Sequence, residues 1–359
     1  MKAIVFEKTG APLRIAELPA PQPGTGEVVV DVVATCVLSY AGEIFSGRRP
    51  YPLDLPAVPG TGAIGRVRAV GNDATRLQAG HWVFCDPTIR ARDDAVAPDI
   101  MLQGLIAPGD GAKRLQAWVG QGSWAEQLRV PTENVTLLGE VEDATAARWC
   151  ALSTLLVPFG GLQAARLQAG ETLLVHGATG SFGSAAVAVG IALGARYVVA
   201  AGRNRTALDG LVSRFGDRVR PAMLGGDFEK DHAAMRAAVP VPIDCVLDIM
   251  PPQVPAGAVR AAAMTVRPQG RIILMGGVGG QSGDELALPY AWLMRNDITV
   301  RGKWMYPPSA PARLVAMVRA GLINLDHFAA TVFPFEAVAD AIAHAASDAG
   351  PFRMTLLKP

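Results

Sequence analysis

The residues best suited to chemistry lie in a glycine-rich turn that contains Gly177, Gly180 and Gly183. An apolar run at residues 172–175 leads into this turn, and an Ala-rich helix pattern at 181–193 follows it. A strand, a tight glycine turn and a helix start together place a pyrophosphate on free backbone N–H groups. Gly180 permits close backbone approach to the phosphates, and Gly183 permits the helix to pack tightly on the strand. The spacing therefore predicts a dinucleotide site.

The turn departs from the strict dinucleotide fingerprint at one position, because Ala178 stands where that fingerprint has a glycine. A glycine-rich turn of some unrelated kind is the alternative interpretation. If the turn binds a dinucleotide, cofactor contacts are expected along its whole length: at Gly177, Ala178, Gly180, Ser181, Phe182 and Gly183.

The end of the next predicted strand indicates which dinucleotide is bound. An acidic residue at this corner selects NAD, whereas a basic residue favours the 2′-phosphate of NADP. Here the strand ends in Gly202, Arg203, Asn204 and Arg205, with no carboxylate. Guanidinium groups present paired donors that suit a phosphate. The alternative is that both arginines are solvated residues at a helix start. We expect these four residues to contact the cofactor, and we expect that cofactor to be NADP(H).

Composition excludes several other classes of function. The 359 residues carry a net charge of +1, and half of them are hydrophobic. A balanced charge argues against binding of nucleic acid or a membrane surface through bulk charge. The first residues resemble a strand and show no signal-peptide pattern. The four cysteines form no Cys-x-x-Cys pair, which indicates reduced thiols and a cytoplasmic protein. The expected partner is a small-molecule substrate.

Two kinds of pattern divide the chain, and its length is typical of about two domains. Short strand patterns separated by turn clusters predict a small β-barrel in residues 1–151. These strands are expected at 3–6, 27–34, 62–70, 82–84 and 123–130. The pattern breaks down between residues 86 and 122, where prolines, glycines and mixed charges predict a long excursion or flap.

Residues 152–305 alternate between strand and helix patterns, which predicts an α/β fold with a doubly wound parallel sheet of the Rossmann type. The helix pattern at 144–167 is expected to be interrupted near Pro158 and the following glycine pair. Residues 306–359 contain a helix pattern at 310–320 and a strand at 354–357. That last strand is expected to return to the barrel.

With the barrel, the glycine turn and the returning tail, the chain resembles the medium-chain dehydrogenase/reductase superfamily. This superfamily includes zinc alcohol dehydrogenases and zinc-free quinone and enone reductases. The resemblance is strongest at residues 33–35, 46–47, 59–65, 70–71, 177–183 and 270–277. It implies a GroES-like β-barrel joined to a Rossmann domain, with the active site in the cleft between them.

The resemblance fails at the zinc positions. An ungapped match places Leu38 and Thr61 where the zinc enzymes have their first two ligands, and only Cys150 falls on a ligand position. A catalytic zinc needs about three protein ligands and a water, which one thiol cannot supply. The 86–122 excursion also contains none of the four cysteines of a structural zinc lobe. We therefore expect no metal, and Cys150 is predicted to be a small buried thiol.

The same match places Tyr40 where the zinc enzymes keep a hydroxyl that relays a proton. A phenol has an ordinary pKa of about 10, so Tyr40 would donate a proton or a hydrogen bond at neutral pH. The alternative is that Tyr40 is a packing aromatic residue. The resemblance also implies cofactor contacts at Ser39, Thr154, Gly276, Gly277, Val278 and Arg353.

These expectations combine into a zinc-independent, NADP(H)-dependent oxidoreductase that transfers a hydride to a conjugated C=C bond or a quinone. A simple carbonyl loses oxyanion stabilisation without a Lewis acid, whereas a conjugated acceptor spreads its charge. Two alternatives remain open: a zinc-free alcohol dehydrogenase or carbonyl reductase, and a non-catalytic NADPH-binding protein. The resemblance further implies a homodimer joined by edge strands near residues 298–302.

Overall fold

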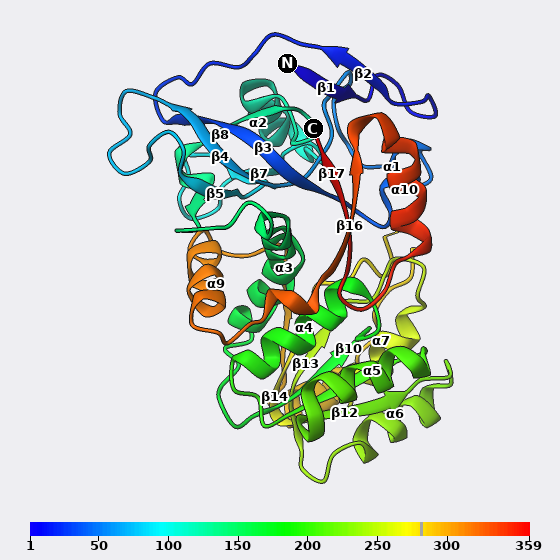
Figure 1. The fold of residues 1–359 in the computed structure, drawn as a ribbon. Helices are drawn as coiled ribbons and strands as arrows, with labels where there is room; N and C mark the ends of the chain where they lie inside the picture. The colour runs from blue at the N-terminus through cyan, green and yellow to red at the C-terminus, as the bar shows by residue number, and fades with distance from the viewer. Residues whose placement is uncertain (281–282) are drawn as a thin grey trace.

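The computed structural model describes residues 1–280 and 283–359. In this part of the chain, a largely antiparallel sheet lies above a parallel sheet in the view of Figure 1. The upper sheet has the order β16-β17-β3-β4-β5-β9, and β8 pairs with the first half of β3. Its seven strands are β3 (Glu27–Val37), β4 (Ala63–Val70), β5 (Trp82–Cys85), β8 (Gln127–Pro131), β9 (Val135–Leu137), β16 (Ala329–Pro334) and β17 (Arg353–Lys358).

The C-terminal tail returns to this upper sheet. In Figure 1 the red strand β17 runs beside the blue strand β3, and residues 355–357 pair antiparallel with residues 35–37. The strand β16, which no sequence pattern predicts, pairs in parallel with β17 at the edge of the sheet. The smaller elements of this half are β1 (Lys2–Val5), β2 (Arg14–Glu17), α1 (Ala41–Phe45), η1 (Thr132–Asn134), η5 (Phe335–Ala337) and α10 (Val338–Ser347).

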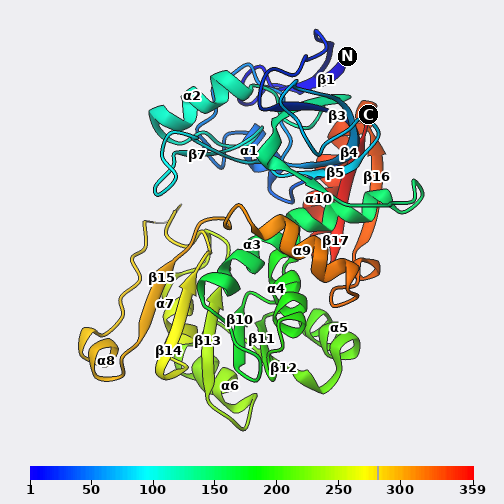
Figure 2. The same cartoon turned by 90° about the vertical axis from the view of Figure 1, so that its left-hand side faces the viewer.

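The lower sheet is entirely parallel and has the order β12-β11-β10-β13-β14-β15. Its strands are β10 (Thr172–His176), β11 (Tyr197–Gly202), β12 (Val219–Met223), β13 (Ile243–Asp248), β14 (Val266–Leu274) and β15 (Thr299–Gly302). Figure 2 shows the six strands side by side, with β15 at one outer edge. The connecting helices and turns are α4 (Ser181–Ala192), α5 (Arg205–Phe215), η3 (Gly216–Arg218), α6 (Phe228–Ala237), α7 (Ala256–Ala263) and α8 (Tyr290–Arg295).

Helices cover both faces of the parallel sheet because alternate side chains of each strand point to opposite faces. Leu173 and Val175 of β10 pack with α4, α5 and two further helices, α3 (Ala151–Ala164) and α9 (Ala310–Arg319). Leu174 belongs to a second cluster, which packs against α6 and α7. The expected α/β fold with a doubly wound parallel sheet is confirmed.

The 86–122 excursion contains regular structure that the sequence analysis did not predict. A short hairpin of β6 (Thr88–Arg90) and β7 (Ile100–Leu102) is followed by the helix α2 (Gly109–Val119). Ala112, Leu115 and Val119 of this helix are buried in a small core of their own. Their helical spacing was obscured because the first turn contains two glycines and follows a proline.

The expected interruption of the helix near Pro158 was wrong. Residues 146–150 form the 3₁₀ turn η2 (Ala146–Cys150), and α3 then runs without a break through the buried Pro158. The glycine pair in α3 serves close packing: a Cβ on Gly160 would lie 2.6 Å from the Met305 carbonyl oxygen. A Cβ on Gly161 would lie 2.3 Å from the Met275 sulfur. Both glycines therefore let other segments approach the helix and do not end it.

Among the described residues, no helix combines the length and the apolar character that a membrane crossing requires. The remaining short turn, η4 (Leu325–His327), joins α9 to β16.

Candidate active site

The glycine turn has the geometry that the sequence predicted. Gly177 has a φ of +97°, a conformation that favours glycine, and a Cβ on Gly183 would lie 2.0 Å from the Gly177 carbonyl oxygen. Gly183 is therefore required for the contact between α4 and the end of β10. Gly180 differs, because a Cβ there would meet only that same oxygen at 3.7 Å. Protein packing alone does not require a glycine at position 180, whereas a closely approaching ligand would.

The N-terminus of α4 offers free hydrogen-bond donors beside Gly180. The first backbone N–H groups of a helix have no partner within the helix, and here no side chain caps them. Ser181, Phe182 and Gly183 contribute these groups, which carry the positive end of the helix dipole. This set of donors fits a pyrophosphate.

The parallel sheet changes direction next to this turn. From β10 the chain moves outward to β11 and β12, and it then returns to place β13 on the other side of β10. Ligands of open α/β sheets bind where the strand order reverses in this way, beyond the carboxyl ends of the strands. His176 and Asp248 end the two adjoining strands and form a buried pair, with 2.7 Å between Nδ1 and Oδ1.

The four residues predicted at the end of β11, residues 202–205, differ in their structural roles. A Cβ on Gly202 would lie 2.5 Å from the Thr179 side chain, so glycine is required there by packing. The Asn204 side chain caps α5 by accepting a hydrogen bond of 3.0 Å from the Ala207 N–H. Arg203 and Arg205 are both exposed.

Arg203 lines a pocket together with His176, Leu224, Met250 and other residues from the ends of the strands. Within the described part of the chain, no hydrogen bond or ion pair involves its guanidinium group. The position suits an anionic group on a ligand that enters this pocket. A positive side chain at a helix N-terminus is unfavourable beside the positive end of the helix dipole, and a bound anion would offset this effect.

A second cleft lies between the two sheets. It brings together six of the predicted residues: Ser39, Tyr40, Thr154, Ser181, Phe182 and Arg353. Gly276, Gly277 and Val278 follow β14 and are not among the described residues that line either pocket. The Gly277 N–H is also engaged, because it donates to the Met250 carbonyl at 2.9 Å.

Arg353 reaches the cleft because the tail is fixed beside α4. The Phe352 N–H donates to the Ser184 hydroxyl in the first turn of that helix, at 3.1 Å. Arg353 begins β17 at this point, and its guanidinium lies 4.0 Å from the Asp348 carboxylate. A cation is thereby held near the donors at the start of α4.

Tyr40 is half-buried at the start of α1, on the barrel side of the cleft. The Arg49 guanidinium lies 4.0 Å from the centre of its ring, and the Tyr51 ring packs edge-on against it at 6.3 Å. Burial raises the pKa of Tyr40 above its usual range, and Tyr51 adds to this effect. The phenol therefore keeps its proton at neutral pH and can donate it.

The residues at the family's zinc positions do not fit a catalytic zinc. Leu38 and Thr61 line the cleft but offer no thiolate, imidazole or carboxylate, and Cys150 is buried. In the described ranges, no group of three or more His, Cys, Asp or Glu side chains is arranged to hold a metal ion. Cys36, which no sequence pattern singled out, also lines this cleft and contacts Cys150.

A second overlooked feature is a buried pair at the back of the cleft. The Tyr306 hydroxyl donates to Asp86 Oδ1 at 2.7 Å, and both residues are 3% exposed. Burial raises the pKa of Asp86, although hydrogen bonds from Thr88 and Tyr306 act against the rise. The two partners are 220 positions apart in sequence, so no local pattern connects them.

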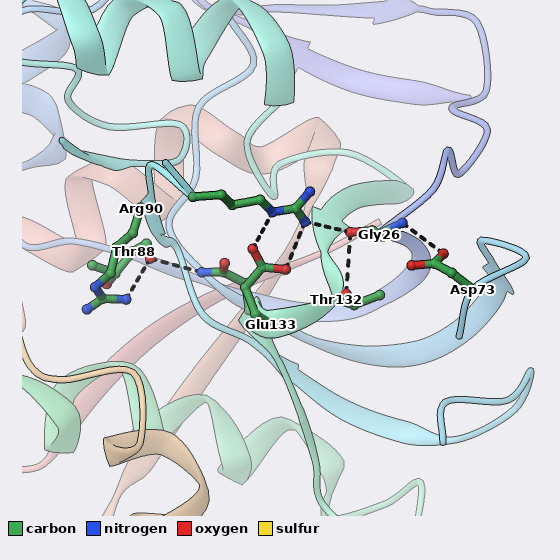
Figure 3. Close-up of polar contacts among 8 residues, drawn as sticks. Gly26, Asp73, Thr88, Arg90, Thr132 and Glu133 are labelled. Atoms are coloured by element: carbon green, nitrogen blue, oxygen red, sulfur yellow. Dashed lines mark hydrogen bonds and ion pairs between the residues drawn. The ribbon is translucent and has the colours of Figure 1, made fainter. Parts of the chain in front are cut away.

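Figure 3 shows how the excursion that carries Asp86 is fixed to the barrel. Arg92 makes two hydrogen bonds to the Glu133 carboxylate, at 2.6 and 2.9 Å, and a third to the Gly26 carbonyl at 2.9 Å. The Thr88 carbonyl accepts from Asn134 at 2.9 Å and from Arg90 at 3.0 Å. Arg90 also donates to the Tyr306 backbone carbonyl, which connects the excursion to the segment after β15.

Comparison with known proteins shows which proteins this chain resembles. Residues 24–140 match the model of the alcohol dehydrogenase GroES-like domain. Alcohol dehydrogenase 1 of Emericella nidulans is 29% identical over 213 residues, which cover 56% of each chain. An alcohol dehydrogenase of Rhizobium meliloti is 28% identical over 307 residues, or 84% of this chain and 83% of the relative. Residues 24–140 thus contain an alcohol dehydrogenase GroES-like domain, and the chain as a whole is similar to alcohol dehydrogenases.

The fold agrees over the full length with solved structures of this group. The alcohol dehydrogenase of Thermus sp. ATN1 superimposes with a TM-score of 0.81 at 22% identity, covering 100% of this chain and 99% of the other. The match to the first relative in sequence spans only about half of that protein's length. The alcohol dehydrogenase-like part of the expected resemblance is thus confirmed, whereas a specific place among the quinone reductases stays a prediction.

Proposed function

We propose that this chain is an NADP(H)-dependent oxidoreductase that interconverts an alcohol and a carbonyl compound. The observation that carries the proposal is the position of Tyr40 in the same cleft as Thr154 and the first turn of α4. A nicotinamide cofactor, when bound, supplies or accepts the hydride. The relatives in sequence favour alcohol and carbonyl chemistry over the reduction of an enone or a quinone.

Each group of residues has a separate task in this proposal. The N–H groups at the start of α4 bind the pyrophosphate, and Arg353 supplies a nearby positive charge. Arg203 binds the 2′-phosphate and so selects NADP(H) over NAD(H). Tyr40 holds a proton at its phenol oxygen and donates a hydrogen bond to the substrate oxygen, which stabilises developing negative charge there.

The reaction is proposed to proceed without a catalytic zinc, since Leu38 and Thr61 cannot act as zinc ligands. Elemental analysis of the purified protein should find well below one zinc per chain. Chelators should leave turnover and thermal stability unchanged. Stoichiometric zinc together with chelator-sensitive turnover would contradict this part of the proposal.

Reduction of a conjugated C=C bond or a quinone is the second candidate. The cleft offers the Tyr40 phenol, and the described residues contain no group of three metal-ligating side chains, which suits an acceptor that spreads its charge. Oxidation of NADPH should be followed with aldehydes, ketones, enones and quinones, and formation of NADPH with alcohols. Turnover confined to carbonyls and alcohols supports the first candidate, and turnover confined to enones or quinones supports the second. Tight NADPH binding without turnover would indicate a non-catalytic NADPH-binding protein.

A further inference from the structure

Two cysteines from distant parts of the chain meet at the wall of the cleft. Cys36 lies on β3, is half-buried and lines the cleft. Cys150 ends η2 directly before α3 and is 1% exposed. The Cys36 thiol donates to the Cys150 carbonyl oxygen at 3.6 Å, so the two residues are in direct contact. One sulfur is thus open to the cleft, and the other lies behind it.

The two thiols differ in their readiness to react. The contact with Cys150 lowers the pKa of Cys36, and although burial opposes this effect, a hydrogen bond from Ser153 adds to it. The pKa of Cys150 is raised by the same contact and by burial. Since the thiolate is the nucleophile, Cys36 is the residue of the pair that reacts first.

The remaining cysteines provide a contrast within the same molecule. Cys85 and Cys245 are fully buried, and burial raises the pKa of each to about 12. Neither residue lines the cleft, and all four cysteines are free thiols. An oxidant that enters the cleft would therefore meet Cys36 and not these two.

We propose that Cys36 and Cys150 are an oxidant-sensitive thiol pair that closes to a disulfide under hydroperoxides. With hydrogen peroxide, the Cys36 thiolate attacks one oxygen and the O–O bond breaks; the departing hydroxide takes up the proton that the thiol released, so Cys36 sulfenic acid and one water form. The Cys150 thiol then attacks this sulfur, the S–O bond breaks, and the disulfide and a second water form. Two thiols lose two electrons in total, and the hydroperoxide receives them.

Disulfide formation requires a movement of the two side chains. A disulfide needs an S–S distance of about 2.05 Å, and the Cys36 sulfur already lies 3.6 Å from the backbone carbonyl oxygen of Cys150. The bond would join β3 to the residue that precedes α3, and Ser153 and Thr154 in the first turn of α3 line the same cleft. Oxidation should therefore change the wall at which the substrate and the nicotinamide are expected to meet, and it should reduce turnover reversibly.

Thiol counting and peptide mapping test the proposal without any need for enzymatic activity. The full chain should be treated with hydrogen peroxide, denatured in an alkylating reagent and digested. We expect the number of free thiols per chain to fall from four to two, with a new disulfide-linked peptide joining Cys36 to Cys150. Dithiothreitol should restore all four thiols.

Variants separate this pair from general oxidation of the protein. Cys36→Ser and Cys150→Ser should each abolish the linked peptide, whereas Cys245→Ala should leave its yield within about twofold of wild type. The proposal is overturned if the wild type retains four thiols, if Cys85 or Cys245 is consumed first, or if Cys36 becomes sulfinic acid without a link. If a serine variant fails to fold, the peptide map of the wild type still decides. These readings do not depend on the proposed oxidoreductase activity, so either proposal can fail alone.

Discussion

At the scale of single residues, the hydroxyl of Tyr40 carries the proposed chemistry. Tyr40→Phe keeps the ring and its contact with Arg49 but removes the proton donor. The rate of hydride transfer should fall by about 10²-fold or more, the usual scale for a positioned acid. NADPH affinity should change little, because the phenol is proposed to face the substrate. Single-turnover loss of nicotinamide absorbance measures this step apart from product release.

Tyr51→Phe is the matched control for this experiment, since Tyr51 packs against Tyr40 but does not line the cleft. Its rate should remain within threefold of wild type. The raised pKa of Tyr40 also means that the phenol stays protonated below a pH of about 10, so the wild-type rate should show no loss from its ionisation there. If the Tyr40→Phe rate stayed within threefold of wild type, Tyr40 would not be the proton donor and would be only a packing aromatic residue.

Arg203 decides the choice of cofactor in our proposal. Arg203→Ala should weaken NADPH binding by about 1.5–3 kcal/mol, the usual loss for a charge-assisted hydrogen bond, and should leave NADH binding nearly unchanged. Titration of both cofactors against wild type and variant measures the difference. Arg196→Ala, at the opposite end of β11, removes the same charge away from the pocket and should affect neither cofactor. Equal wild-type affinities for NADH and NADPH would contradict the assignment.

Sequence predicted those site residues that lie within one continuous segment, and it did not predict contacts between residues distant in sequence. The glycine turn is a continuous segment, and its backbone requirements at Gly177 and Gly183 follow from spacing alone. The contact of Cys36 with Cys150 and the pair of Asp86 with Tyr306 join residues 114 and 220 positions apart. Such contacts depend on the way in which the tail, the linker and the barrel pack together, and no sequence spacing encodes them.

At the scale of elements, the turn between β10 and α4 contains two glycines with different reasons for being glycine. Gly180→Ala should weaken NADPH binding by tenfold or more while costing at most about 1 kcal/mol of stability, because alanine is a poorer helix cap. Gly183→Ala should destabilise the fold itself, since its Cβ would lie 2.0 Å from a backbone oxygen. Thermal unfolding and NADPH titration of both variants separate the two effects. Equal losses of stability would contradict the distinction.

The segment after β5 contains the buried carboxyl of Asp86, and it should give folding stability a measurable pH dependence. The pKa of Asp86 is raised in the folded protein, so the folded state binds more protons, and this contribution to stability is lost as the pH rises. Asp86→Asn keeps an oxygen acceptor but cannot ionise. Its free energy of unfolding, relative to wild type, should therefore increase from pH 4.5 to pH 8, by up to about 1.4 kcal/mol for each pH unit.

Denaturant unfolding at a series of pH values measures this dependence. Asp93→Asn is the control, because Asp93 is exposed in the same excursion and should show the same pH profile as wild type. Tyr306→Phe should be destabilised by about 1–3 kcal/mol, since it removes the donor that Asp86 accepts. A relative stability of Asp86→Asn that falls with pH would contradict the burial of an ionisable carboxyl at this position.

Elements with a clear hydrophobic period were predicted best. The inner strands β10, β11 and β13 of the parallel sheet are near-continuous apolar runs, which is the pattern that predicted this sheet. The helix α2 was missed because glycines occupy its first turn, and the interruption at Pro158 was wrong because packing of α3 outweighs the lost hydrogen bond. In both α2 and α3, packing against the rest of the molecule outweighs the local preferences of glycine and proline.

At the scale of the whole molecule, the site exists only because both sheets contribute to it. The barrel supplies Ser39 and Tyr40, α3 supplies Thr154, and the returning tail supplies Arg353. We propose the domain division at residues 151/152 and 305/306, which places the cleft between the two units. The 306–359 segment completes the barrel sheet through β16 and β17, so its removal should abolish folding of the barrel along with the cleft.

The outer edge of the parallel sheet is the place where we expect a second copy of the chain to bind. Among the described residues, the strand β15 has a sheet neighbour on one side only; all four of its residues are exposed, and Val300 is 39% exposed. Tyr290, Met294 and Trp304 add exposed apolar surface next to it. An open strand edge with apolar neighbours favours pairing with another strand edge, and two identical edges can pair across a twofold axis.

Sedimentation equilibrium should therefore give twice the chain mass of 37.6 kDa for the wild type. Val300→Lys places a charge on the pairing edge and should raise the dimer dissociation constant by at least tenfold. Val332→Lys is the matched control, since Val332 is 42% exposed on β16, the edge strand of the other sheet. A monomeric wild type would contradict the proposed dimer. If Val332→Lys dissociated the dimer and Val300→Lys did not, the two chains would pair through the edge of the barrel sheet instead.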